Sequence, residues 1–280
     1  MKQTPYYFLL PSILILAFTS LYPICYSVYY SLFNWRWGDE KDFIGLNNYI
    51  VLLSDKEFWI IVKNTFVFAF FACFFEILIG VLLAIYIDRI KIGSTIIRTV
   101  LLIPLMVSGI SVTMLFKVML DNMFGIIPYL LSFIGLKSDF FGSYTAAMPT
   151  IIALDVWWQT SFVFIIILAG LKSIPNEPIE AAKIDGASEW EITRYIRLPM
   201  IRSLLFLVLI FRSIDTLKVF DIVWGTTAGG PGLATEALQT YAYRVAYSFL
   251  EMSKSMTVMV LFSIVVIFLT ILYSRLNKDL

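Results

Sequence analysis

The sequence predicts an all-α membrane protein with six transmembrane helices, on the evidence of its composition, its long apolar runs and the distribution of its basic residues. Of the 280 residues, 60% are hydrophobic and only 15% are charged, whereas a soluble domain has about 25% charged residues. This excess of apolar residues is too large for a core and must face lipid. The chain has no histidine and a net charge of +1. We therefore predict no catalytic residue, no metal site and no nucleic-acid partner.

Six apolar runs are each long enough to cross a bilayer as a helix, which takes about 20 residues and satisfies its own backbone hydrogen bonds. The expected spans are 7–33, 60–87, 97–117, 149–169, 204–224 and 256–275. The first run is too long for the apolar part of a signal peptide, so we expect a retained span. A shorter run at 123–136 is expected to be interfacial or re-entrant. The spans predict one transmembrane domain over residues 1–280.

The basic residues predict the orientation, because cytoplasmic segments of membrane proteins are enriched in lysine and arginine. With the N-terminus inside, eleven basic residues lie in or beside the cytoplasmic segments, and only six lie in the longer outer segments. The cytoplasmic set is Lys2, Arg89, Lys91, Arg98, Lys172, Lys183, Arg194, Arg197, Arg202, Arg275 and Lys278; the outer set is Arg36, Lys41, Lys56, Lys137, Arg244 and Lys254. Both termini are expected in the cytoplasm.

The long cytoplasmic loop at 170–203 is expected to form two short helices around a bend. Pro175 suits the first turn of a helix, and Gly186 can adopt the left-handed conformation that ends one. Ser188 then begins the second helix, and Glu191 three residues later completes a capping box. Residues 198–199, Leu-Pro, are expected to end that helix before the fifth span.

Such a pair of helices needs a surface to pack against. The second helix has an expected apolar face of Ile192, Tyr195 and Ile196. One alternative is that the helices lie on the membrane surface, where basic residues are usually abundant. The small Ala181 and Ala182 beside an acidic residue fit a groove in a partner protein better.

Three short motifs follow one another in this loop: Glu180-Ala181-Ala182, Asp185-Gly186-Ala187 and Ile196-Arg197-Leu198-Pro199. In order and spacing they resemble the EAA loop of the permease subunits of ABC importers, where the loop is a coupling helix that docks in a groove of the ATP-hydrolysing subunit. The resemblance implies that the loop contacts such an ATPase. The implied coupling residues are Glu180, Ala181, Ala182, Asp185, Gly186, Ala187, Leu198 and Pro199.

Further motifs along the chain resemble the permeases of the maltose and glycerol-3-phosphate type, in particular the first of their two paired subunits. They are Thr4-Pro5-Tyr6 through Leu10-Pro11, Phe43-Ile44-Gly45-Leu46-Asn47-Asn48-Tyr49, Asn64-Thr65, Arg212-Ser213-Ile214-Asp215, Val219-Phe220-Asp221 and Gly229-Gly230-Pro231-Gly232 with Ala234-Thr235-Glu236. The resemblance implies the type I ABC importer architecture and the inner membrane of a bacterium or archaeon. It also implies a homologous second permease, two copies of an ABC ATPase and an extracytoplasmic sugar-binding protein.

The implied cargo is a carbohydrate, of di- or oligosaccharide size. No phosphate loop of the G-x-x-x-x-G-K-S/T kind occurs in the chain, so ATP and Mg²⁺ are expected on the partner ATPase and no cofactor on this chain. The family places its translocation cavity between the helices that flank the EAA loop.

Polar residues in the fourth and fifth spans are the candidates for the sugar path, because charged groups inside spans usually face a bundle interior or a cavity. Residues on one helical face share a spacing of three to four. The candidates are Asp155, Trp158, Gln159 and Phe162 in the fourth span and Arg212, Asp215 and Thr216 in the fifth. Glu76 and Lys117 are expected to lie against partner helices or to snorkel, without a role toward the substrate. An alternative for Arg212 and Asp215 is an intrahelical pair that only neutralises charge.

Other functions stay open at this point. The same machine could carry glycerol 3-phosphate, a glycerol phosphodiester, a polyol or a peptide, and Arg212 would suit an anionic cargo. A secondary transporter acting alone would predict inverted repeats and broken helices, which the sequence does not reveal. An intramembrane enzyme would need a catalytic pair, and none is clustered in the sequence.

Overall fold

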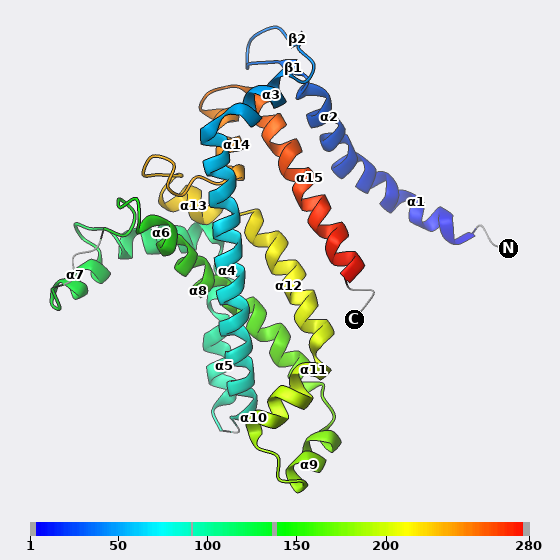
Figure 1. Ribbon diagram of the computed structural model, residues 1–280, viewed down its shortest axis with the longest axis vertical. Helices are drawn as coiled ribbons and strands as arrows, with labels where there is room; N and C mark the ends of the chain where they lie inside the picture. Colours follow the sequence, from blue (N-terminus) through cyan, green and yellow to red (C-terminus); the bar gives the residue numbers. More distant parts are fainter. Residues whose placement is uncertain (1–3, 91, 136–138, 277–280) are drawn as a thin grey trace. The chain divides into compact units, whose positions relative to one another are not determined.

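The structure is a computed structural model that describes residues 4–90, 92–135 and 139–276, and the side chains from residue 9 onward (Figure 1). Four of the cations behind the predicted orientation, Lys2, Lys91, Lys137 and Lys278, lie outside the described residues, as do the side chains of the Thr4-Pro5-Tyr6 motif. The described elements are helices and one two-stranded antiparallel ribbon. The helical class predicted from composition is therefore confirmed.

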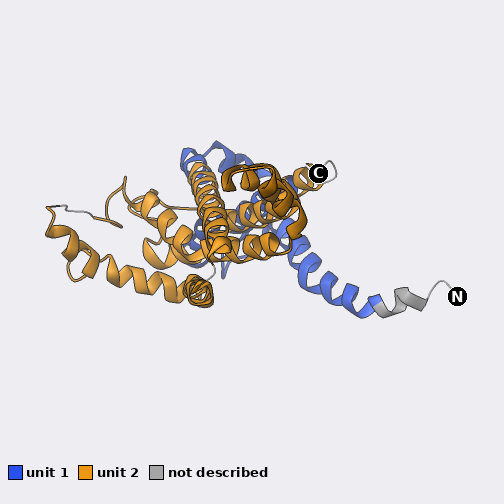
Figure 2. Cartoon of the chain, turned by 90° about the horizontal axis from the view of Figure 1, so that it is seen from below, with its two compact units in different colours: residues 1–62, 238–268 blue, residues 63–237, 269–280 orange. Residues whose placement is uncertain are grey.

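The chain divides into two compact units, residues 1–62 with 238–268 and residues 63–237 with 269–280 (Figure 2). The division falls within two long helices, α4 (Lys56–Arg89) and α15 (Met252–Leu276). The prediction of a single domain over 1–280 stays a prediction.

The first unit contains the N-terminal helices and the ribbon. Its remaining elements are α1 (Thr4–Leu16), the π-helical turn η1 (Ala17–Leu21), α2 (Tyr22–Tyr30), β1 (Phe33–Asn34), β2 (Asp42–Phe43), α3 (Asn47–Ser54) and α14 (Leu238–Tyr247). The ribbon pairs Phe33 with Phe43 and Asn34 with Asp42.

Asn48, in one of the motifs singled out above, fastens the segment between α2 and β1. Its Nδ2 donates to the carbonyl oxygens of Ser31 at 2.8 Å and Phe33 at 2.7 Å. The fully buried Ser31 shares a second hydrogen bond with the Tyr49 hydroxyl at 2.6 Å. The motif therefore has a structural role in holding the first loop.

The second unit contains the central helices and the long loop. Its remaining elements are α5 (Ser94–Leu102), the 3₁₀ turn η2 (Pro104–Met106), α6 (Gly109–Met119), α7 (Ile126–Ser132), α8 (Ala147–Lys172), α9 (Asn176–Ile184), α10 (Glu189–Ile192), the π-helical turn η3 (Thr193–Arg197), α11 (Leu198–Met200), α12 (Arg202–Leu217) and α13 (Asp221–Thr226).

Four helices in the described part of the chain are long and apolar enough to span a membrane: Leu9–Tyr30, Lys56–Arg89, Ala147–Lys172 and Met252–Leu276. They match four of the six predicted spans to within a few residues. No residue of the first span is buried, whereas 56% of the third is. More than half of the residues of α8 are buried, and they include the polar Asp155, Thr160 and Ser161, so α8 is the central helix of its unit.

The predicted span 97–117 is not one straight helix, because α5 with η2 and α6 meet at 97°. Pro104 begins the 3₁₀ turn, where its missing N–H interrupts the helical hydrogen bonds. Val107 then adopts an extended conformation, and Ser108 caps α6 by accepting a hydrogen bond from the Ser111 backbone at 3.4 Å. If the bent pair counts as one span, the described chain has five.

The predicted span 204–224 is also interrupted. The helix α12 ends at Leu217 after 16 residues, and α13 begins at Asp221. Sixteen residues span about 24 Å, which is less than the hydrocarbon core of a bilayer. The six-span count therefore stays a prediction. Two of the predicted spans are therefore interrupted, which the sequence did not reveal.

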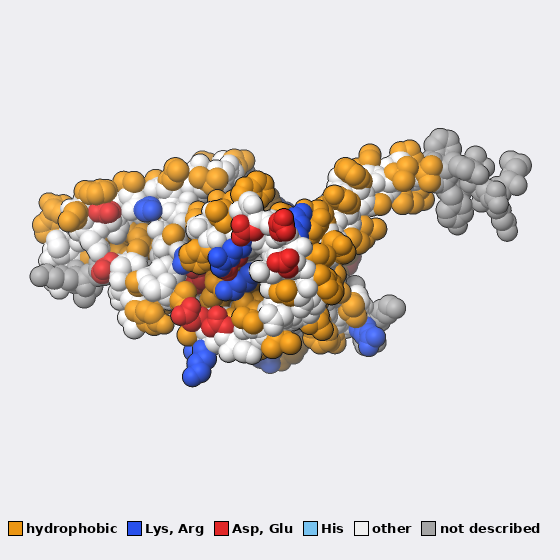
Figure 3. All heavy atoms as spheres, turned by 90° about the horizontal axis from the view of Figure 1, so that it is seen from above, with side chains coloured by type: hydrophobic (Ala, Val, Ile, Leu, Met, Phe, Trp, Pro, Cys, Tyr) orange, Lys and Arg blue, Asp and Glu red, His pale blue; other side chains and the backbone are white. Residues whose placement is uncertain are grey.

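Two apolar clusters lie in the second unit, one on each side of a polar layer. The first contains Phe68, Ala72, Ile152 and Val219, and the second contains Ala84, Val163, Phe164 and Val208. Along α4, α8 and α12 the residues between these clusters are Glu76, Asp155 with Gln159, and Arg212 with Asp215. Outside the clusters, large apolar side chains such as Phe70, Phe74 and Phe268 are more than half exposed, as expected for a surface that faces lipid. Figure 3, viewed from above, shows hydrophobic side chains over much of the visible helices and charged side chains gathered near the middle of the view.

Candidate functional site

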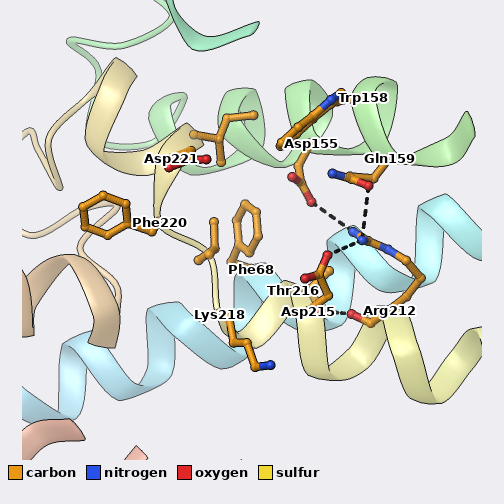
Figure 4. Close-up of a pocket in the computed structure, with 12 residues that line it drawn as sticks. Phe68, Asp155, Trp158, Gln159, Arg212, Asp215, Thr216, Lys218, Phe220 and Asp221 are labelled. Carbon is orange, nitrogen blue, oxygen red and sulfur yellow. Dashed lines mark hydrogen bonds and ion pairs between the residues drawn. The ribbon is translucent and has the colours of Figure 1, made fainter. Parts of the chain in front are cut away.

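Arg212 of α12 is at the centre of the polar layer and is only 3% exposed. Its Nε donates to Glu76 Oε2 at 2.6 Å and its Nη2 to Glu76 Oε1 at 2.9 Å, a bidentate pair across α4 and α12. Nη1 donates to Asp215 Oδ2 at 2.5 Å and to Gln159 Oε1 at 3.4 Å. Nη2 also lies 3.6 Å from Asp155 Oδ2. Figure 4 shows Asp155, Gln159 and Asp215 converging on the guanidinium.

The pairing follows from burial, since a charged side chain at membrane depth is tolerated when partners surround it. Glu76 is fully buried and Asp155 is 6% exposed, so both carboxylates need the guanidinium. Asp215 differs, because 62% of its side chain is exposed. The hydroxyl of Thr216 donates to the Arg212 carbonyl at 2.8 Å and keeps its own polar atom satisfied. The layer is therefore a three-helix ion-pair network with one carboxylate at its open side.

A pocket of about 220 Å³ opens beside this network (Figure 4). It lies against α8, the end of α12 and the segment between α12 and α13. Its lining residues are Phe68, Asp155, Trp158, Gln159, Arg212, Asp215, Thr216, Lys218, Val219, Phe220, Asp221 and Ile222. Six of the seven predicted path residues therefore line one pocket: Asp155, Trp158, Gln159, Arg212, Asp215 and Thr216.

Phe162 is the exception among the predicted path residues. It packs against the second apolar cluster and does not line the pocket. It lies two turns from Asp155, about 10 Å along the helix axis. Glu76 was not expected in the site, and its pairing with Arg212 over 136 residues of sequence was missed. The intrahelical pair of Arg212 and Asp215 does form.

Trp158 joins the pocket to the bend of the third apolar run. Its indole Nε1 donates to the Val107 carbonyl oxygen at 3.1 Å. That carbonyl is released from helical bonding by the extended conformation of Val107, and the half-buried Trp158 indole supplies its hydrogen-bond donor. One turn further, the Ser161 hydroxyl donates to the Leu101 carbonyl at 2.6 Å. The helix α8 therefore satisfies both sides of the bend.

The loop between α8 and α12 has the two helices and the bend that the sequence predicts. The first helix, α9, begins after Pro175, and Gly186 has a φ of +82°. The Ser188 hydroxyl accepts from the Glu191 backbone at 3.3 Å, and the Glu191 carboxylate accepts from the Ser188 backbone at 2.8 Å. The capping box and the left-handed glycine are both confirmed.

The end of the second helix differs from the prediction. The helical run continues from Glu189 through the π-helical turn η3 to Met200, one residue beyond Pro199. It ends at Ile201, before α12 begins at Arg202. Tyr195 is exposed, whereas Ile192 and Thr193 are buried. The buried side of this helix is therefore only partly the apolar face that was expected.

Glu189 draws three basic side chains together at the start of the second helix. It lies 3.2 Å from Lys183 Nζ, 3.7 Å from Arg197 Nη1 and 3.9 Å from Arg89 Nε. Arg89 also donates to the Thr193 hydroxyl at 2.8 Å, which ties the end of α4 to this loop. Burial favours the neutral form of Glu189, but hydrogen bonding to Lys183 and the surrounding charges lower its pKa overall.

The outward side of the loop keeps apolar residues exposed. Ile184 is 86% exposed and Trp190 is 64% exposed. Glu180, Ala181, Asp185 and Gly186 are exposed as well, and Ala182 and Ala187 are half-buried. The predicted coupling residues of this part therefore lie on an accessible surface with both apolar and acidic side chains. Their role in coupling stays a prediction.

Comparison with known proteins places most of the chain in one family. Residues 76–280 match the family described as binding-protein-dependent transport system inner membrane component. The chain is 34% identical over 240 residues to the trehalose/maltose transport system permease protein MalF of Thermococcus litoralis, covering 85% of this chain and 81% of the relative. It is 32% identical to the probable ABC transporter permease protein y4oQ of Sinorhizobium fredii, covering 90% and 83%.

A third relative is the sn-glycerol-3-phosphate transport system permease protein UgpA of Yersinia pseudotuberculosis, 30% identical over 97% of this chain and 93% of the relative. Among solved structures, a chain of a bacterial ABC transporter involved in the import of the acidic polysaccharide alginate has a TM-score of 0.87 at 22% identity, covering 99% of this chain and 96% of that chain. At this identity the likeness shows a shared fold.

Proposed function

The chain belongs to the family of inner membrane components of binding-protein-dependent transport systems, and from this premise we propose that it is a permease subunit of an ATP-driven importer of carbohydrate. The observation that carries the proposal is the match over residues 76–280 together with the trehalose/maltose relative. A di- or oligosaccharide is the proposed cargo. Glycerol 3-phosphate is a second candidate, favoured by the likeness to UgpA.

The proposed assembly contains this chain, a homologous second permease and two copies of an ATPase that binds ATP and Mg²⁺. An extracytoplasmic binding protein brings the sugar to the outer face. Both termini of this chain are on the cytoplasmic side, and the chain itself is not catalytic.

The loop from α9 to α11 is proposed to dock on the ATPase. Its exposed Ile184 and Trp190 offer apolar contact area, and Glu180 offers a charge. The left-handed Gly186 sets the angle between the two helices. The contacts of Arg89 with Glu189 and Thr193 provide a link from this loop to α4, the helix that also carries Glu76.

The pocket beside Arg212 is proposed to be part of the sugar path. A sugar presents hydroxyl groups that need acceptors and donors, and C–H faces that pack on aromatic rings. Asp155, Asp215 and Asp221 supply acceptors, and Trp158 supplies an aromatic wall. The two interruptions, between α5 and α6 and between α12 and α13, leave non-helical backbone beside this pocket, which is tolerated at membrane depth where it lines a cavity.

The test is uptake of radiolabelled saccharides into proteoliposomes that contain the assembled transporter, with partners taken from the neighbouring genes. We expect uptake that requires both ATP inside and the binding protein outside. Uptake that continues without ATP and without a binding protein would instead support a secondary transporter and contradict the proposal.

The sugar path is tested by Gln159→Leu and Trp158→Ala, with uptake divided by the amount of assembled complex. Loss of one hydrogen-bonding partner of a desolvated hydroxyl costs on the order of 1–3 kcal/mol, which is roughly a five- to 150-fold loss of affinity. The matched control is Gln239→Leu in α14, which lies outside the pocket. Normal uptake per assembled complex in both pocket variants would show that these residues serve packing alone.

A further inference from the structure

We propose that the pocket beside Arg212 selects against anionic solutes and takes a neutral, multiply hydroxylated one, because its arginine is already paired with the protein's own carboxylates and one amide. The inference rests on the proposed function and decides between its two candidate cargoes. Arg212 alone, considered as a residue of the sequence, would suit an anion. The geometry around it leads to the opposite conclusion.

The guanidinium of Arg212 has five N–H groups; four hydrogen bonds to oxygens of the protein use them, and the remaining one faces a carboxylate beyond hydrogen-bond distance. Nε and one N–H of Nη2 bind the two oxygens of Glu76, at 2.6 and 2.9 Å. The two N–H groups of Nη1 meet Asp215 and Gln159, at 2.5 and 3.4 Å. The second N–H of Nη2 faces Asp155 at 3.6 Å. Arginine recognises carboxylate and phosphate through paired N–H groups, and no such pair is left here for a solute.

The exposure of the partners adds to this effect. Arg212 is 3% exposed, whereas 62% of the Asp215 side chain is exposed. A solute that enters the pocket therefore meets the carboxylate before the guanidinium. An anion would be brought beside a like charge while losing its water, and like charges placed together at an interface oppose binding.

The charged side chains that line the pocket are negative on balance. Among the described lining residues, Asp155, Asp215 and Asp221 carry carboxylates, and Arg212 and Lys218 are cations. Glu76 lies behind the pocket, where it pairs with Arg212 and shares a side-chain hydrogen bond with Asp155, so these two carboxyl groups hold one proton between them and the pocket keeps a small excess of negative charge. Lys218 is exposed and follows the last residue of α12. Figure 4 shows its side chain extending away from Asp155.

Carboxylates that are not saturated by cations accept hydrogen bonds from hydroxyl groups. Asp215 uses Oδ2 for Arg212, and its exposed side chain leaves acceptor capacity toward the pocket. Asp221 adds a second carboxylate at the far side of the lining (Figure 4). A solute rich in hydroxyl donors and free of charge matches this lining, which is the chemistry of a neutral sugar or polyol.

The test measures the charge preference of the pocket directly, through the reaction of an introduced thiol. In the assembled transporter with Cys25 and Cys73 replaced by alanine, Gln159→Cys places a thiol beside Arg212. Three methanethiosulfonate reagents are compared: neutral methyl, cationic trimethylammonium-ethyl and anionic sulfonato-ethyl. Each rate is divided by the rate of the same reagent with a free thiol. The substitution frees the N–H of Arg212 that Gln159 accepts, and a free N–H would favour the anionic reagent; the substitution therefore biases the test against the proposal.

We expect the anionic reagent to react at least about tenfold more slowly than the cationic one, because a net negative charge in the pocket repels the anionic reagent and attracts the cationic one. Asp215→Asn in the same background should reduce that ratio severalfold, and the control Asp88→Asn should leave it unchanged. Equal rates, a faster anionic reagent, or no reaction even with the neutral one would overturn the proposal. Because labelling needs no cargo, ATP or binding protein, its outcome is independent of whether the uptake experiment succeeds.

Discussion

Glu76→Gln should destabilise the transporter strongly, because it breaks the bidentate pair with Arg212 while keeping the size of the side chain. Two unit charges about 4 Å apart at an effective dielectric constant near 20 interact with roughly 4 kcal/mol, and breaking a buried pair costs about 3–5 kcal/mol. Asp155 and Asp215 still face the guanidinium in the variant. We therefore expect a loss of about 2–3 kcal/mol in the free energy of unfolding, below the full cost of an isolated pair.

The assay is equilibrium unfolding of the purified transporter by titration with SDS, for Glu76→Gln, Arg212→Gln and the double variant. Residues in direct contact are non-additive, so the double variant should lose about 2 kcal/mol less than the sum of the single losses. The control is Glu57→Gln, an exposed glutamate on the same helix, which should stay within about 0.5 kcal/mol of the parent. An additive double variant, or Glu76→Gln no worse than the control, would refute the assignment.

Three further predictions concern the loop and the topology. Gly186→Val should abolish uptake with the protein still in the membrane, because a β-branched residue at φ +82° distorts the bend. The control Gly38→Val, at φ +95° outside the loop, should retain uptake. Equal uptake by the two variants would contradict the coupling role. A single cysteine at Ser188 should react with an impermeant reagent only in inverted vesicles and one at Glu40 only in spheroplasts, and the reverse pattern would overturn the orientation. The ion pairs of Glu189 lower its pKa, so they stabilise the loop above the ordinary glutamate pKa of about 4.3, and this stabilisation is lost as pH falls through the lower folded pKa. Proteolysis of the loop in inverted vesicles should therefore become faster in acid in the parent protein and depend less on pH in Glu189→Gln. Identical pH profiles for the two proteins would count against the ion pairs.

Features that depend on a few neighbouring residues were predicted well from the sequence. The capping box of Ser188 and Glu191 and the left-handed Gly186 are local, and each formed as expected. The four unbroken spans were also predicted, since length and composition suffice for them. Six residues of the predicted path line one pocket, because a polar residue in an apolar span has few places to be satisfied other than beside another.

Features that depend on the direction of a helix axis or on contacts between residues distant in sequence were not predicted from the sequence. The apolar run at 97–117 gives no sign in its composition of a 97° bend, because hydropathy does not record where the axis turns. Glu76 has no polar neighbour on its own helix face, and its partner is 136 residues away. Phe162 does not line the pocket with the other predicted residues, because helical periodicity gives the face of a residue and not its depth along the axis.

The hydrogen bond from Trp158 to Val107 limits how the cargo range of this protein can change. Replacing Trp158 by a smaller residue to enlarge the pocket would also remove the donor that satisfies the Val107 carbonyl at the bend. A larger cavity would therefore come with a less stable bend between α5 and α6. Lys218, Val219 and Phe220 line the same pocket from a segment that belongs to no helix. Substitutions there alter the lining without breaking a helical hydrogen bond. Divergence of specificity among relatives should therefore concentrate in these three positions, with the tryptophan retained.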